Sequence, residues 1–396
     1  MGSLEDGSSI KEKLTLGSFI ILSVLMAFTS LSVDIYLPQM PQMSEDLHGD
    51  VELTITGFLI GFSIAQLFIG PISDKYGRKL PLILGIILYI IGSIGCATSG
   101  TLIAVIGWRV VQAIGACTGP LLSRAMVRDL FGRAKAAEVL STLMFIMAIA
   151  PVLGPIIGGQ LSWQHIFWFL ASIGFIMLIS LFWLPESHPP KKRNQASIGA
   201  TFSKYRILIV NREFMRYTIC VTFFYVGVYA FIAGSPFVYI SYFGIAPENY
   251  GWLFAINTLG LMLVSFGNRF WVRRVSLDLL LRRATTVSML AGIALIIFTQ
   301  SNTGGLLGIV VPIFFYFSMN GVVAATTTAA ALDDIPEIAG AGSALLGSLQ
   351  YGSGILSTFL LSLFETHTPT TMAWIIGLAG IGCAATMLAK PKALLK

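Results

Sequence analysis

The stretch LGSFIILSVLMAFTSLSVDIYLPQMPQM, residues 16–43, decides the fold class of this chain. It begins with apolar and small residues in a run long enough to enter a bilayer as a helix, which needs about 20 residues. Asp34 then stands near the end of that run. A charge at the bilayer centre costs about 2.5 to 3.5 kcal/mol, so charged residues there usually face a wet cavity or a partner. The stretch therefore predicts a membrane helix that carries a functional carboxyl group.

The composition of the whole chain predicts an integral membrane protein. Of its 396 residues, 55% are hydrophobic and only 11% are charged, and the mean hydropathy is +0.81. These values lie outside the range of soluble globular chains. Apolar runs like the first one recur along the chain, so we expect an all-α polytopic protein with twelve transmembrane helices. Their approximate spans are 17–38, 51–72, 80–99, 103–126, 138–161, 166–185, 217–243, 250–270, 279–300, 306–331, 339–364 and 371–389.

The basic residues predict how these spans are oriented. If the N-terminus is cytoplasmic, all but one of the 25 Lys and Arg residues fall in cytoplasmic segments, as the positive-inside rule requires. Both termini are therefore expected inside the cell. The net charge of +6 then reflects topology and contact with anionic lipid, and no nucleic-acid partner is implied.

The chain is expected to form two halves of six helices each. A Pro-containing, basic segment joins them, and it contains a possible short surface helix around 201–210. Two six-helix halves with substrate bound near the midplane are a transporter architecture. The expected parts are an N-terminal cytoplasmic tail (1–16), a first bundle (17–185), a cytoplasmic linker (186–216), a second bundle (217–389) and a C-terminal cytoplasmic tail (390–396).

Two charged residues are interpreted as lying within the membrane rather than near its cytoplasmic surface or at the outer span ends, Asp34 and Arg109. Their expected depths agree, so the two side chains could meet. Burial favours the neutral form of a carboxyl group, whereas a nearby guanidinium favours the ionised form. A change in solvent access or in the distance between the two residues would therefore load and unload a proton. The simpler alternative is that Asp34 caps its helix and Arg109 reaches the membrane interface with its charged end.

Two further motifs have a physical interpretation. In GPISDKYGRK (70–79), Gly70 and Gly77 allow a tight turn, while Asp74 and Arg78 can make ionic contacts; alternatively, this loop is solvated and only fixes topology. In APVLGPIIGG (150–159), glycines leave a smooth helix surface for close packing and prolines remove backbone donors. The residues of this second motif are Pro151, Gly154, Pro155, Gly158 and Gly159.

A mostly apolar pocket with a few polar anchors would suit amphipathic compounds. For any single aromatic residue, packing between helices is the alternative. Arg124 either lines the cavity or reaches the cytoplasmic surface with its charged end, and we favour the second interpretation. The candidate substrate-binding residues are Tyr36, Phe62, Gln66, Gln112, Tyr225, Tyr229, Asn257, Tyr316, Asn320 and Gln350.

The motifs together resemble the major facilitator superfamily. GPISDKYGRKL (70–80) resembles its loop 2/3 signature, WRVVQAIGACTGP (108–120) its helix 4 arginine motif and APVLGPIIGGQL (150–161) the helix 5 motif of its antiporters. SVDIYLPQMPQM, SRAMVRDLF, LSWQHIFWFLA, GSPFVYI and LDDIPEIAGAGSALLG resemble the Bcr/CflA branch of bicyclomycin and chloramphenicol resistance antiporters. The resemblance implies that Asp74, Arg78 and Asp129 form a cytoplasmic charge cluster that holds an outward-open state. It also implies a bacterial source and a monomer.

We therefore expect a multi-pass transporter of the bacterial inner membrane that exports small amphipathic or hydrophobic drugs in exchange for protons. The proton gradient would supply the energy, and no cofactor or metal is implied. An exporter of a metabolite such as a sugar, an amino acid or a short peptide is the alternative. A membrane enzyme is not expected, because no metal-ligand cluster and no nucleophile with a placed base occurs in the spans. A membrane-embedded sensor would bind a ligand without moving it across the bilayer.

Overall fold

The structure is a computed structural model that describes residues 16–190, 193, 198–364 and 368–388. Across this part of the chain the regular elements are all helices, and twelve helical segments are long and apolar enough to cross a membrane. The predicted fold class is confirmed. The predicted tails lie outside the described residues, apart from Leu16.

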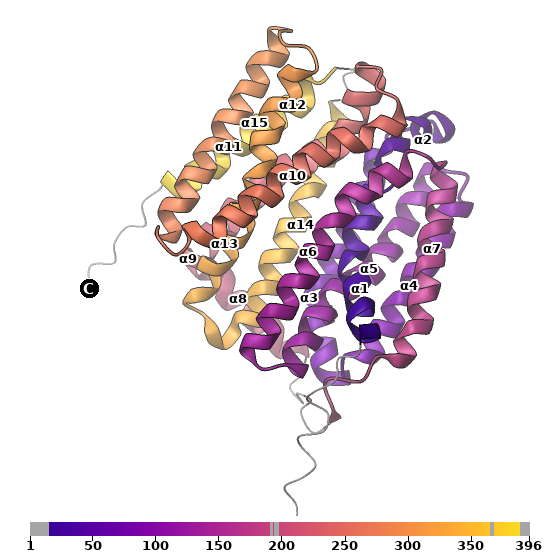
Figure 1. The fold of residues 1–396 in the computed structure, drawn as a ribbon, viewed down its shortest axis with the longest axis vertical. Helices are drawn as coiled ribbons and strands as arrows, with labels where there is room; N and C mark the ends of the chain where they lie inside the picture. Colours follow the sequence, from indigo (N-terminus) through magenta and orange to yellow (C-terminus); the bar gives the residue numbers. More distant parts are fainter. Residues whose placement is uncertain (1–15, 191–192, 194–197, 365–367, 389–396) are drawn as a thin grey trace, which may run out of the picture.

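Most of the helix boundaries fall within a few residues of those predicted, and Figure 1 shows their arrangement. The elements are α1 (Leu16–Asp34), η1 (Leu37–Gln39), α2 (Met40–Leu47), α3 (Glu52–Tyr76), α4 (Lys79–Thr98), α5 (Leu102–Leu130), α6 (Arg133–Gly158), α7 (Trp163–Ser180), η2 (Leu181–Trp183), α8 (Ile198–Val210), α9 (Arg212–Pro236), η4 (Phe237–Tyr242), α10 (Pro247–Trp271), α11 (Leu277–Gln300), α12 (Leu307–Ser318), α13 (Asn320–Asp333), η5 (Pro336–Ile338), α14 (Ala339–Leu363) and α15 (Thr370–Leu388).

Three helices differ from the predicted spans in ways that matter for the site. The span predicted at 306–331 consists of two helices, α12 and α13, which are interrupted at Met319. Helix α5 continues to Leu130, beyond the predicted end of the span at residue 126. Helix α9 begins at Arg212, inside the predicted linker, and Asn211 caps it by accepting a hydrogen bond from the Phe214 N–H at 3.0 Å.

The first six spans pack mainly on one another, as do the last six, so the molecule has two halves (Figure 1). The end of the bundle formed by residues 74–79, 128–133, 186–190, 193, 198–216, 268–283 and 334–338 is called the basic face, because segments rich in Lys and Arg lie there. The other end is called the opposite face.

The two halves contact each other through α3 with α14 and through α6 with α10. Hydroxyl groups connect α3 to α14. The hydroxyl oxygens of Thr56 and Thr358 are hydrogen-bonded at 2.6 Å, and the Ser348 hydroxyl donates to the Ser63 carbonyl at 2.8 Å. Near the opposite face, the Ser362 hydroxyl donates to Asp50 at 3.0 Å. This antiparallel pair therefore links the halves from the opposite face to the middle of the bundle.

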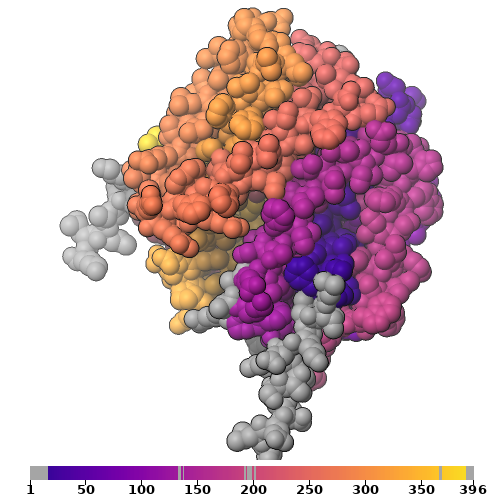
Figure 2. Space-filling view, viewed as in Figure 1, coloured from indigo at the N-terminus to yellow at the C-terminus, as the bar shows by residue number. Residues whose placement is uncertain are grey.

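Helices α6 and α10 come closest near the opposite face, where Gly251 of α10 lies against the backbone of Ile156. A Cβ atom at Gly251 would lie only 2.7 Å from the Ile156 nitrogen, so the approach requires glycine. In Figure 2 the first half, indigo to magenta, and the second half, orange to yellow, meet along this contact. The opposite face is thus closed between the halves.

Candidate functional site: a cavity, a buried acid and a charge cluster

A cavity of about 450 Å³ lies between the halves at the basic face. Its walls come from α3, α5 and α6 of the first half, from α14 and η5 of the second half, and from the linker helix α8. The exposed residues Arg128, Lys204 and Glu337 are part of its lining, so it opens toward that face. Together with the closed opposite face, this gives a transporter-like arrangement with access from one side.

Phe62 and Gln66 are the two predicted substrate-binding residues that line this cavity. Tyr351, which the sequence analysis missed, also lines it, and its ring centroid lies 4.4 Å from that of Phe62. The sequence could have suggested Tyr351, because it directly follows the predicted residue Gln350. The other predicted residues lie elsewhere: Tyr36 and Gln112 in the core of the first half, and Tyr225, Tyr229, Asn257, Tyr316, Asn320 and Gln350 in the second half.

Arg124 lines the cavity, which favours the first of the two interpretations that the sequence left open. Helix α5 continues for six residues beyond it, to Leu130. At 1.5 Å per residue, Arg124 therefore lies about 9 Å before the end of the helix. The length of α5, rather than the residue type, determines this depth.

The linker helix α8 binds to α3 at the edge of the cavity. Pro71 has no N–H group, so it cannot donate to the Leu67 carbonyl within the helix. The Tyr205 hydroxyl donates to that carbonyl at 2.8 Å instead. Burial raises the pKa of Tyr205, so its hydroxyl remains a donor. The linker thus provides the hydrogen bond that the proline removes.

Asp34 lies at the end of α1, between the halves, and is only 5% exposed. Its carboxyl group makes no hydrogen bond or ion pair with any described residue. It lies close enough to Tyr229, Tyr250 and Tyr351 of the second half to act on their hydroxyl groups electrostatically. Asp34 is therefore a buried acid that faces the second half.

Arg109, on α5, is fully buried in the first half. Its guanidinium donates to the Gln112 side chain at 2.6 Å and to the Ser32 carbonyl at 3.0 Å. It also lies over the rings of Tyr36 and Phe58, at 4.7 and 4.5 Å from their centroids. These cation–π contacts and hydrogen bonds stabilise a charge that has no carboxylate partner among the described residues.

Asp34 and Arg109 therefore do not form the contact that the sequence allowed. Arg109 binds the backbone of Ser32, which precedes Asp34 by two residues. The Asp34 carboxyl group lies instead near Tyr229, Tyr250 and Tyr351 of the second half. Arg109 holds the first half together, while Asp34 faces the boundary between the halves.

The glycines of the helix 5 motif lie at the end of α6, beside Asp34. A Cβ atom at Gly154 would lie 3.3 Å from the Ile35 nitrogen, and one at Gly158 would clash with the Ile35 carbonyl. Gly159 faces α10 instead, where a Cβ atom would lie 2.6 Å from the Pro247 carbonyl oxygen. One helix end thus packs on both the acid-bearing helix and the second half. Pro151 and Pro155 lie within α6, which stays helical to Gly158.

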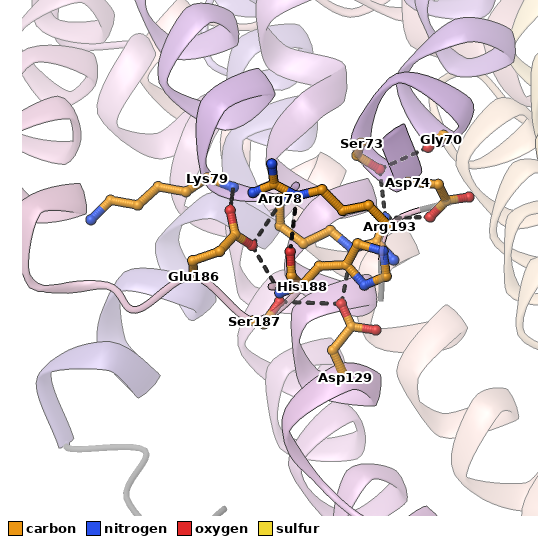
Figure 3. Close-up of polar contacts among 10 residues, drawn as sticks. All are labelled: Gly70, Ser73, Asp74, Arg78, Lys79, Asp129, Glu186, Ser187, His188 and Arg193. Carbon is orange, nitrogen blue, oxygen red and sulfur yellow. Dashed lines mark hydrogen bonds and ion pairs between the residues drawn. The ribbon is translucent and has the colours of Figure 1, made fainter. Parts of the chain in front are cut away.

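A charge cluster stands at the basic face, and Figure 3 shows Arg78 at its centre. The Arg78 guanidinium pairs with Asp74 at 2.6 Å and with Asp129 at 2.9 Å. Burial favours its neutral form, but the two carboxylates outweigh that effect and hold the pKa of Arg78 above its usual value. The Ser187 hydroxyl also donates to Asp129, at 3.2 Å. Because all these residues belong to the first half or directly follow it, the cluster stays intact while the cavity opens at this face.

Glu186 completes the cluster and was missed by the sequence analysis. Its carboxylate accepts hydrogen bonds from the backbone N–H groups of Arg78 and Lys79, at 3.0 and 3.1 Å, at the start of α4 (Figure 3). Gly77 makes the turn before α4 with φ at +94°, as predicted for a tight turn. Gly70 does not, because α3 continues helically to Tyr76 and Gly70 lines the cavity.

The model of the Major Facilitator Superfamily matches residues 22–358. The chain belongs to this superfamily. It is 34% identical, over 366 residues and 90% of each chain, to an uncharacterised transporter of Bacillus subtilis in the same superfamily. It is 29% identical, over 372 residues and 92% of each chain, to a bicyclomycin resistance protein homolog of Haemophilus influenzae, which confirms the resemblance to the bicyclomycin resistance branch.

The solved structures agree on the fold of this superfamily member. A nucleoside transporter superimposes with a TM-score of 0.75 over 94% of this chain and 98% of its own, at 12% identity. At that identity the likeness shows the fold alone. Superfamily members are membrane transporters rather than enzymes, so this chain is a multi-pass membrane transporter.

Proposed function

We propose that this transporter is a proton-coupled antiporter of the bacterial inner membrane that exports small amphipathic or hydrophobic compounds. The proposal depends on one observation: the Asp34 carboxyl group is buried and has no ionic or hydrogen-bonded partner among the described residues. An unpaired buried charge costs several kcal/mol, so such a group binds a proton when it is shielded and releases it when water or substrate reaches it.

The positive-inside rule supports a cytoplasmic basic face, with both termini inside the cell. The cavity then opens to the cytoplasm and receives compounds from inside. Of the residues near Asp34, Tyr351 lines this cavity, and the ring centroids of Tyr351 and Tyr229 are 6.4 Å apart. Proton release from Asp34 would therefore pass these tyrosines on its way to the cytoplasm.

The return step would open the opposite face. Separation of α6 from α10 would expose the end of α6, where Gly154 and Gly158 pack on Asp34 and Ile35. Asp34 would then take up a proton from outside while substrate leaves. A proton that moves inward gains about 2.3 kcal/mol per 100 mV, which is enough to drive export without ATP.

Substrate-dependent proton release from energised everted vesicles tests the proposal. Chloramphenicol and bicyclomycin are the first compounds to use, because the chain resembles resistance transporters and is similar to a bicyclomycin resistance protein homolog. We expect a proton signal with the intact protein and none with Asp34→Asn. An unchanged signal in Asp34→Asn would place the proton site elsewhere, and the absence of any signal would argue for a metabolite substrate.

A further inference from the structure

We propose that the cavity at the basic face prefers amphipathic anions and that Arg124 is the residue that holds their negative charge. This inference rests on the proposed function, because it names the substrate class of the same transporter. Arg124 is an exposed residue that lines the cavity. Its guanidinium makes no hydrogen bond or ion pair with any described residue.

The contrast with Arg78 shows that Arg124 is available for a ligand. Arg78 also touches the cavity, but its donors already bind Asp74, Asp129 and Ser73. Arg124 keeps its planar set of N–H donors unused. A guanidinium of this kind matches the geometry of a carboxylate, sulfonate or phosphate group and can bind it with two parallel hydrogen bonds.

The surroundings of Arg124 suit a ligand with one charged end. The guanidinium lies close enough to Tyr225 and Tyr351 to act on their hydroxyl groups electrostatically. Gln66 lines the same cavity, and its buried side-chain oxygen has no hydrogen-bond partner. Tyr351 and Gln66 therefore offer polar groups in the same cavity as the guanidinium.

The rest of the wall is largely apolar. Phe62, Leu121, Leu140 and Met147 all line the cavity. Its volume of about 450 Å³ falls within the range of about 300 to 1,000 Å³ of sites for drug-sized ligands. A compound with an aromatic or aliphatic body and a single negative group fits these features.

The charges near the mouth favour the same class. Arg128 and Lys204 line the mouth and have no ion-pair partner among the described residues. Asp74 is engaged by Arg78, so Glu337 is the lining carboxylate that stays free of an ion pair within the described chain. This excess of positive charge attracts anions to the cavity.

Equilibrium binding of a matched pair of probes tests the inference. We suggest 2-naphthoate and its uncharged amide, 2-naphthamide, with the purified full chain in lipid nanodiscs and empty nanodiscs as background. The unmodified protein should bind the carboxylate about tenfold or more tightly, as expected for a charge-assisted bond. Arg124→Gln should abolish the preference and Arg124→Lys should keep part of it. Arg269→Gln, at an exposed arginine outside the cavity, should not alter the preference.

Three results would overturn the inference: equal binding of the two probes by the unmodified protein, binding of neither, or an unchanged preference in Arg124→Gln. The first two need no variant, so the test holds even if Arg124→Gln fails to fold. The proton-release experiment uses uncharged compounds and is therefore independent. Proton release without a carboxylate preference would refute only this inference, whereas a preference without proton release would refute only the proposed function.

Discussion

Replacing Gly251 by alanine adds one methyl group at the contact between α6 and α10. The new Cβ atom would lie 2.7 Å from the Ile156 nitrogen and 2.9 Å from its Cα, well inside ordinary contact distance. Because backbone atoms cannot move aside locally, the two helices must separate near the opposite face. Overpacking of this kind costs about 1 to 3 kcal/mol. The state with a closed opposite face should therefore lose population by about 5- to 150-fold relative to the state in which the helices are apart.

The same substitution should not damage the helix itself. Gly251 lies inside α10, where alanine is favoured over glycine by about 1 kcal/mol in any conformation. The predicted effect is therefore a shift between two folded states rather than unfolding, and apparent thermal stability should stay within a few degrees of the parent protein.

Alkylation of an introduced cysteine measures this shift. Leu37 is fully buried in η1, which packs against α6 and α10, and all four native cysteines are buried. In a Leu37→Cys background in nanodiscs, Gly251→Ala should raise the rate of labelling by a polar maleimide. Gly107→Ala is the matched control, because nothing lies within 4 Å of its added methyl group. An unchanged rate in Gly251→Ala, or an equal rise in both variants, would refute the reasoning.

Three further substitutions test single contacts through thermal unfolding in detergent. Tyr205→Phe removes the bond to the Leu67 carbonyl and should cost about 0.5 to 1.5 kcal/mol. Arg78→Gln breaks the cluster with Asp129 and should cost about 2 to 3 kcal/mol, less than a fully buried pair because the cluster is partly exposed. Arg109→Lys keeps the charge but loses the planar set of donors, and should cost about 1 to 3 kcal/mol.

The first two of these variants have controls on the surface, and Arg109→Lys is compared with the parent protein. Tyr242→Phe changes an exposed tyrosine, and Arg269→Gln changes an exposed arginine. If Tyr205→Phe melts at the same temperature as Tyr242→Phe, the linker bond has no energetic role. Equal melting of Arg78→Gln and Arg269→Gln would contradict the importance of the cluster. A melting temperature of Arg109→Lys equal to that of the parent would show that charge alone holds the first half together.

The sequence predicted the helical fold well because the evidence for it is local. Length and apolarity mark each span, and the motifs at 70–79 and 150–159 are each continuous in the chain. The interruption at Met319 was not predicted, because the run 306–331 is apolar on both sides of it. The predicted span ended at residue 126, whereas α5 ends at Leu130. Hydropathy indicates which residues lie in the membrane, and it does not indicate how far a helix continues beyond the membrane.

The candidate site was harder to predict, because its geometry depends on which side of each helix a residue faces. Equal depth suggested that Asp34 meets Arg109, but the rotation of α1 turns Asp34 toward the second half. Glu186 binds backbone N–H groups, which have no signature in the sequence. The sequence left the position of Arg124 open, because its depth depends on the length of α5.

The central claim is that Asp34 carries the transported proton, and reconstituted transport tests it most directly. In proteoliposomes, the intact protein should accumulate substrate when a pH gradient is imposed and should exchange labelled for unlabelled substrate without a gradient. Asp34→Asn should lose accumulation driven by the pH gradient yet retain exchange, because exchange needs no net proton movement. Gradient-driven accumulation of normal extent in Asp34→Asn would contradict the account.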